Sequence, residues 1–172
     1  MNPIIKLTPP PQSLVDAITP IMDWVPEPQQ LQPKPSTQLI DFLLNPASST
    51  EQSKQIHQTT SIIDQCFLTY MHHPHDITAQ LQCNQSWHRF VSLSLKNTTW
   101  CHALCYLTPN VVAAMDQHLL LGQYLTKHHY QRNILGFSLN QHHQVIRKSL
   151  WKHPSLPNIP LLECITYSLS DI

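Results

Sequence analysis

Glycine and charged residues are the two scarcest features of this chain. It contains two glycines, Gly122 and Gly136, among 172 residues. Loops that cradle nucleotide phosphates need several glycines close together, and the nucleophile elbow of α/β-hydrolases needs two glycines around a serine, so both motifs are excluded. Charged residues make up 12% of the chain, and the formal net charge is zero with histidine neutral. This balance argues against a protein that binds nucleic acid or an anionic membrane through a basic stripe.

Long apolar runs are also missing. No run approaches the ~18–20 apolar residues that span a bilayer. The first residues, Met1–Lys6, lack the charged and apolar regions of a signal peptide. We therefore expect a cytoplasmic protein without membrane insertion, and its length fits one domain that we expect to be a monomer.

Cysteine and histidine offer no pattern typical of metal sites. The five cysteines form no C-x-x-C pair, and in the cytoplasm they are expected to be reduced, small hydrophobic residues. Several of the twelve histidines are adjacent, as in His72-His73 and His142-His143. Adjacent side chains point in different directions, whereas metal ligands must converge, so we expect no metal site.

Proline divides the chain into two parts. Residues 1–35 carry nine of the fifteen prolines, which excludes a long helix or a central strand there. We predict an N-terminal extension over residues 1–35, with one short helix at 13–19, and a folded domain over residues 36–172.

The periodicity of the folded part predicts an α+β protein with a single antiparallel sheet of five to six strands and helices packed around it. We expect strands at residues 62–71, 87–95, 100–108, 133–139, 145–152 and 159–169, and helices at residues 37–44, 48–59, 110–116 and 119–125. A turn that contains Pro74 is expected at residues 72–76, and a hairpin connection at residues 96–99. The strand at 87–95 alternates with period two and places Arg89 on the same face as Val91, Leu93 and Leu95. Ser48 and Glu51 fit a capping box at the start of the second helix.

Arginine is rare, and its positions are informative. Arg89, Arg132 and Arg147 each lie within or beside a predicted strand, and arginine binds carboxylates through two parallel hydrogen bonds. Glu163 lies inside an apolar run, where a carboxylate must be paired or must shift its pKa and become useful as an acid or base. Together they indicate a pocket for a small carboxylated ligand. The alternative is that these side chains reach outward to solvent.

Six segments, taken in order, resemble the chorismate lyase family. They are Leu39–Leu44 followed by Ser48-Ser49-Thr50, Trp87-His88-Arg89, the strand from Trp100 that ends at Pro109, Leu121–Leu125, Arg147-Lys148-Ser149, and Pro160–Glu163. The resemblance runs from about residue 39 to residue 169.

The resemblance implies a chorismate pyruvate-lyase, which converts chorismate to 4-hydroxybenzoate and pyruvate in the first step of ubiquinone biosynthesis. It implies no cofactor and no metal, and a buried pocket beside one antiparallel sheet. Glu163 would be the catalytic glutamate, and Arg89 would hold the ring carboxylate. Backbone N–H groups of Ser49 and Leu121 would complete the substrate contacts. Glu163→Gln is expected to stop turnover with limited effect on folding.

One family arginine is absent from this chain. Counting back from Pro109 places Cys105 at its position, and counting forward from Trp100 places Leu104 there. A cation is therefore missing from a site that handles a dianion, and Arg132 or Arg147 could replace it as a substrate-binding residue. Gln123 and Phe90 also replace charged family residues.

Two alternatives to the enzyme remain open. The same fold serves in transcription regulators as a sensor, so the chain could bind a small aromatic acid without catalysis. It could also be an interaction module that uses its proline-rich N-terminus.

Overall fold

The computed structural model describes residues 4–6, 9–49, 52, 63–95, 98–115 and 120–166. Most of the helix predicted at 48–59, with the Glu51 side of its capping box, lies outside these residues. Residues 96–97 of the predicted hairpin connection and residues 167–169 at the predicted end of the last strand also lie outside the described ranges.

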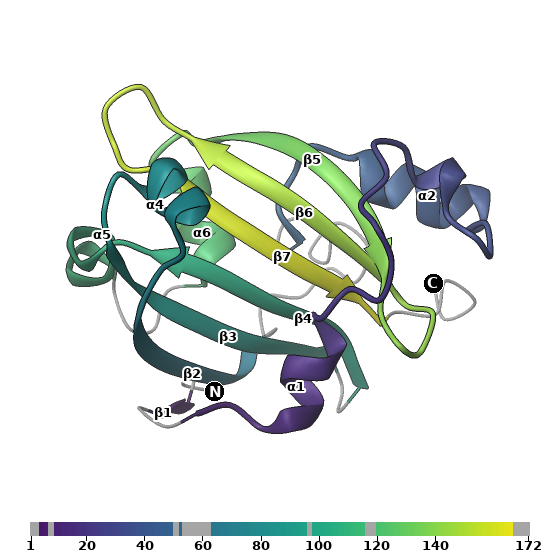
Figure 1. The fold of residues 1–172 in the computed structure, drawn as a ribbon, viewed down its shortest axis with the longest axis horizontal. Helices are drawn as coiled ribbons and strands as arrows, with labels where there is room; N and C mark the ends of the chain where they lie inside the picture. Colours follow the sequence, from purple (N-terminus) through teal and green to yellow (C-terminus); the bar gives the residue numbers. More distant parts are fainter. Residues whose placement is uncertain are drawn as a thin grey trace.

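One sheet of seven strands forms the body of the protein (Figure 1). In spatial order these are β1 (Ile4–Lys6), β2 (Ile63–His72), β3 (Gln85–Leu95), β4 (Thr98–Leu107), β7 (Ile159–Ile165), β6 (Val145–Lys152) and β5 (Gln131–Leu139). Six strands are antiparallel, and the short β1 adds a parallel edge to β2. The predicted α+β fold with a single antiparallel sheet is confirmed.

The connection between β4 and β5 places the last strand in the middle of the sheet. After β4 the chain forms α5 (Pro109–Ala114) and α6 (Leu121–Lys127), then begins β5 at the far edge. The following antiparallel turns bring β6 and then β7 inward, so β7 pairs with β4. A glutamate on β7 therefore lies at the centre of the sheet rather than at an edge.

Most predicted elements have their expected type, with shifts of a few residues at their ends. Helix α2 (Thr37–Leu44) has the predicted bounds, and its N-cap residue Ser36 accepts a hydrogen bond from the backbone N–H of Leu39. Helix α4 (His75–Leu81) replaces part of a predicted turn. Its N-cap is Pro74, a residue read as a turn signal, and Asp76 lies in its first turn, where a negative charge is favourable.

The two faces of the sheet are covered differently. On one face, α2, α5 and α6 contribute to the larger core, which includes Phe42, Leu43, Val111, Leu121 and Leu125. On the other face, α1 (Gln12–Ala17) buries Leu14 and Ala17, with Ile18 beside them, against β-strand residues that include Phe67, Phe90 and Leu104. Figure 1 shows α1 in front of the strands and α6 behind them.

The proline-rich segment lies along the sheet. Val25 and Phe137 exchange two backbone hydrogen bonds of 2.9 and 2.8 Å, and the N–H of Ile21 donates to the carbonyl of Leu139. A short 3-10 helix, Pro28–Gln30, precedes the fully buried Leu31. Residues 14–31 thus contribute side chains to both cores.

Among the residues described above, no helix has the length and apolar character needed to cross a membrane.

Candidate functional site

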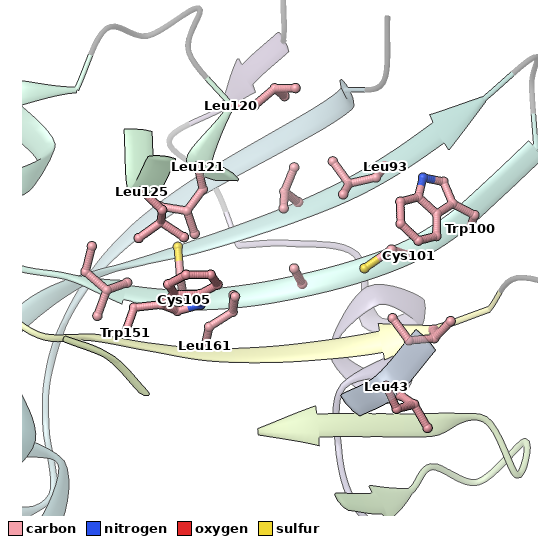
Figure 2. Close-up of a cluster of buried hydrophobic side chains, with 14 of the residues drawn as sticks. Leu43, Leu93, Trp100, Cys101, Cys105, Leu120, Leu121, Leu125, Trp151 and Leu161 are labelled. Atoms are coloured by element: carbon pink, nitrogen blue, oxygen red, sulfur yellow. The ribbon is translucent and has the colours of Figure 1, made fainter. Parts of the chain in front are cut away.

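A buried pocket lies between α6 and the central strands β3, β4 and β7. The cavity that a water-sized sphere can enter has a volume of about 40 Å³, and the space free of atoms is about 410 Å³ when open solvent at its mouth is included. Its lining residues are Ser48, Ser49, Arg89, Val91, Leu93, Cys101, Ala103, Leu120, Leu121, Gly122, Leu125, Leu161 and Glu163. Figure 2 shows Leu121 and Leu125 pointing from α6 toward this face of the sheet. The walls are mostly apolar, with charge at two positions only, as expected of a pocket for a small organic acid.

Strand register places Arg89 and Glu163 on the same face. Val91 pairs with Ala103, and Ala103 pairs with Glu163, so these three residues form one row across β3, β4 and β7. Arg89 lies two residues from Val91 and therefore points to the same side. The alternation seen in the sequence of β3 is thus the reason that a cation faces the pocket.

Glu163 is buried, and both of its carboxylate oxygens accept hydrogen bonds. Its exposed fraction is 2%. Oε1 accepts from Arg132 Nη2 at 2.9 Å, and Oε2 accepts from Ser49 Oγ at 2.8 Å and from Arg147 Nε and Nη2 at 3.2 and 2.5 Å. Three of the four bonds reach Oε2, so Oε1 is the oxygen that retains room for a further donor.

The pKa of Glu163 follows from these partners. Burial alone raises the pKa of a carboxyl group, but the charges of Arg132 and Arg147 and the hydrogen bonds from Arg147 and Ser49 outweigh it. The net result lowers the pKa of Glu163 to about 2. Glu163 is therefore an anion at neutral pH.

Every donor group of the Arg147 side chain is used in hydrogen bonds within the protein. It has no exposed surface, and besides Glu163 and Ser49 it donates to the carbonyls of Phe42 and Leu43 at 3.3 and 2.9 Å and to Gln52 Oε1 at 3.4 Å. These carbonyls belong to the last turn of α2, where no intrahelical partner is available. Arg147 thus ties α2 to the sheet and has no spare donor group for a ligand.

Arg132 differs from Arg147 in its hydrogen bonding. Its side chain has no exposed surface, its guanidinium lies 4.6 Å from the ring centroid of Trp151, and one bond joins it to Glu163. Its Nε and Nη1 are buried without a partner. Burial lowers the pKa of Arg132 to about 10, although Glu163 opposes the shift, so the group stays cationic at neutral pH.

Arg89 is the cation that faces the pocket itself. It is 6% exposed, and within the described part of the chain the ion pairs are those of Glu163, so no described carboxylate neutralises Arg89. Cys105 lies opposite Arg89 in register, whereas Leu104 belongs to the core on the other face. Burial raises the pKa of the Cys105 thiol to about 12, against the opposing effect of Arg89. The thiol is therefore neutral, and Cys105 occupies the Arg89 face without lining the pocket.

The predicted residues fall into two groups. Arg89, Glu163, Ser49 and Leu121 line the pocket together. Arg132 and Arg147 are not among its lining residues, but both donate hydrogen bonds to Glu163, and Arg147 also donates to Ser49.

The apolar lining on the strands consists of Val91, Leu93, Ala103 and Leu161. Alternation along residues 87–95 places Val91 and Leu93 on the face of Arg89, because every second residue shares a face. Ala103 and Leu161 were not predicted as lining residues, because they lie on other strands and their register is not a local signal. The hydroxyl of Ser49 binds Glu163, and the role expected of its backbone N–H stays a prediction.

Within the described ranges, no three His, Cys, Asp or Glu side chains are arranged to hold a metal ion. The absence of a metal and of a cofactor in the working protein stays a prediction.

Comparison with known proteins does not assign the chain to a family. No family model matches the chain, and no curated protein matches it.

Proposed function

We propose that the protein is a chorismate pyruvate-lyase that converts chorismate to 4-hydroxybenzoate and pyruvate. The observation that carries the proposal is the pocket in which Arg89 and Glu163 line one largely apolar space. The resemblance to the chorismate lyase family would make this reaction the first step of ubiquinone biosynthesis. We further propose that the protein works in the cytoplasm as a monomer, without nucleic acid, metal or cofactor.

The charges of the pocket suit an aromatic acid with a hydroxyl group. Arg89 can hold the ring carboxylate through a buried, charge-assisted pair. The ring would lie against Val91, Leu93 and Leu121. A ligand hydroxyl at the opposite end of the ring can donate to Oε1 of Glu163, the oxygen with a single protein donor.

The reaction needs orientation more than strong acid or base groups. The ether bond between the ring and the enolpyruvyl group breaks, and the ring carbon that bears the hydroxyl loses its proton. The ring gains its third double bond and becomes aromatic, while the enol leaves and takes up a proton to become pyruvate. Because aromatisation drives the reaction, fixing the geometry can supply much of the acceleration.

The geometry also limits what Glu163 can do. A carboxylate with a pKa of about 2 is a weak base, because its negative charge is already stabilised. Its role in the proposed mechanism is to orient the hydroxyl and to offset the positive charge that develops on the ring as the ether bond breaks, until loss of the ring proton neutralises that charge.

A second function is favoured by a different observation. Cys105, which takes the position of the family arginine when counted back from Pro109, pairs with Arg89 in register and has a neutral thiol. Arg89 is the cation among the described lining residues, and a pocket with one cation suits a monocarboxylate such as 4-hydroxybenzoate. The alternative is therefore a non-catalytic protein that binds a small aromatic acid.

Purified protein incubated with chorismate distinguishes the two functions. Equal amounts of 4-hydroxybenzoate and pyruvate, formed faster than without protein and lost in Arg89→Gln, are expected of the lyase. Tight binding of 4-hydroxybenzoate without turnover would support the binding protein. Neither turnover nor binding would contradict both.

A further inference from the structure

Within the part of the chain that the structure describes, four buried polar groups on Arg132, which binds Glu163, and on its neighbours have no hydrogen-bond partner. They are Nε and Nη1 of Arg132, Oγ of Ser149 and Nε1 of Trp151. The nitrogen groups can only donate hydrogen bonds, and the hydroxyl can donate or accept. Buried donors are normally satisfied, so a cluster of four calls for an acceptor.

The four groups belong to neighbouring residues. Arg132 on β5 pairs in register with Trp151 on β6, and its guanidinium lies over the indole ring. Ser149 precedes Trp151 by two residues and so points to the same face. Since Arg132 also reaches Glu163 on β7, its side chain crosses β6, where Ser149 and Trp151 lie.

The charge of this cluster is unbalanced. Arg132 and Arg147 carry two positive charges, and Glu163 carries one negative charge. Water could satisfy the unpaired donors but would leave the excess charge in a buried environment, which is unfavourable. An anion with oxygen acceptors satisfies both requirements, and a carboxylate matches the guanidinium geometry.

We propose that Arg132, Ser149 and Trp151 form a second carboxylate subsite beside Glu163, so that the ligand of this pocket is a dicarboxylate. The inference rests on the proposed function, in which Arg89 holds the first carboxylate. Arg89 is on β3 and Ser149 on β6, three strand spacings or roughly 14 Å apart. Cys105 and Leu161 lie between them in one row across the sheet, and Leu161 lines the pocket. The arginine side chains shorten the distance from both ends.

The subsite would supply the cation that is missing at Cys105. Chorismate carries a ring carboxylate and an enolpyruvyl carboxylate, whereas 4-hydroxybenzoate carries only the first. Binding the second carboxylate would select the substrate over its aromatic product, and pyruvate would carry that carboxylate away. The subsite therefore favours the lyase over the binding protein.

Two non-reactive probes that differ only in the second carboxylate test the subsite. 4-(Carboxymethoxy)benzoate has both carboxylates, and 4-methoxybenzoate lacks the second. The variant Ser149→Ala/Trp151→Phe removes two donors and keeps every charge and the aromatic ring. By calorimetry we expect its affinity for the dicarboxylate to fall by about tenfold or more, with the affinity for the monocarboxylate unchanged.

Trp100→Phe is the matched control, because Trp100 lies in the same core but does not line the pocket. It should leave both affinities unchanged. Ser149→Ala alone provides a milder variant if the double change impairs folding, and the same selective loss, though smaller, is expected.

The indole N–H resonance of Trp151 gives a direct readout. The chain has four tryptophans, and Trp151→Phe identifies the signal that belongs to Trp151. The dicarboxylate should move this resonance downfield, and the monocarboxylate should not.

Three outcomes overturn the subsite. If the double variant lowers the affinity for both probes equally, the cluster does not recognise the second carboxylate. If the Trp151 resonance does not move when the dicarboxylate saturates the protein, the second carboxylate does not bind at Trp151. In either case, binding of 4-methoxybenzoate that depends on Arg89 would leave the proposed function intact. Failure of both probes to bind the wild-type protein would overturn the subsite and the proposed function together.

Discussion

Glu163 differs from an isolated catalytic carboxylate because its negative charge is paired within the protein. It is the shared acceptor of two buried arginines and a serine hydroxyl. A buried ion pair is costly to break, because removing one partner leaves the other charged and unsolvated. Glu163 therefore supports the fold and faces the pocket, and substitutions there change both stability and function.

Replacement of Arg89 tests the pocket with the least disturbance to the fold. Arg89→Gln should weaken binding of 4-hydroxybenzoate and lower kcat/KM for chorismate, because the buried pair with the ring carboxylate is lost. The expected loss of transition-state stabilisation is about 2–4 kcal/mol. Arg89→Lys should recover part of this loss. Calorimetry and steady-state kinetics measure both, and normal binding in Arg89→Gln would show that Arg89 holds no carboxylate.

Glu163→Gln should reduce stability as well as turnover. The substitution leaves Arg132 and Arg147 buried without an anion, so the free energy of unfolding should fall by about 3–5 kcal/mol. This changes the expectation from sequence, in which folding is little affected. Urea unfolding measures the loss, and Lys148→Gln on the neighbouring strand is a control that keeps the cluster intact. A variant as stable as the wild type would mean that the ion pairs contribute little.

The pKa of Glu163 also predicts how stability depends on pH. The carboxyl titrates at about 2 in the folded protein and near 4.5 when unfolded. Its contribution, about 3 kcal/mol, is therefore present above pH 4.5 and is lost as the pH falls from 4.5 toward 2. Urea unfolding from pH 7 to pH 2.5 should show this decline in the wild type and a shallower one in Glu163→Gln. Parallel profiles would contradict the lowered pKa.

At the scale of elements, local patterns predicted the strands and helices but not their partners. Period-two alternation placed Arg89 on the apolar face of β3, and capping signals placed α2. The pairing of β7 with β4 depends on a crossover and joins residues about sixty positions apart, such as Ala103 and Glu163. No local signal reports such a contact, so the sequence indicated that Glu163 must be paired or shift its pKa but did not identify Arg132 and Arg147 as its partners.

The N-terminal extension shows the same limit. Its prolines correctly excluded long regular structure, but the packing of α1 against the sheet depends on residues such as Phe67 and Phe90 far along the chain. Helix α4 was missed because Pro74 is both a turn residue and a suitable position before a helix.

Helix α1 should contribute to the stability of the whole domain. Leu14 is 3% exposed and packs in the core on the face opposite the pocket. Leu14→Ala should therefore lower the free energy of unfolding by about 2–4 kcal/mol through lost burial and a cavity. Urea unfolding measures the loss, and the half-buried Val15→Ala serves as a milder control. Because the pocket lies on the other face, ligand affinity should not change; an unchanged stability would mean that α1 is dispensable.

At the scale of the molecule, a neutral chain holds a positive interior site. Positive and negative residues balance overall, yet Arg132 and Arg147 pair with Glu163 inside the protein, and Arg89 lines the same pocket. Among the described residues, the site therefore has two more positive than negative charges. Anionic ligands that reach the site should bind the folded state and not the unfolded chain.

Thermal unfolding should consequently respond to specific carboxylates rather than to ionic strength. At 100 times its dissociation constant, a ligand of the folded state adds about 2.7 kcal/mol to stability, which for a chain of this size corresponds to a rise in Tm of about 5–10 °C. We expect 4-hydroxybenzoate to produce this rise at constant ionic strength, while sodium chloride at the same ionic strength does not. Arg89→Gln should abolish most of the rise, because the cation that faces the pocket is gone. A similar rise with chloride, or in Arg89→Gln, would mean that the positive charge of the site is screened nonspecifically and that the pocket has no preference for an aromatic acid.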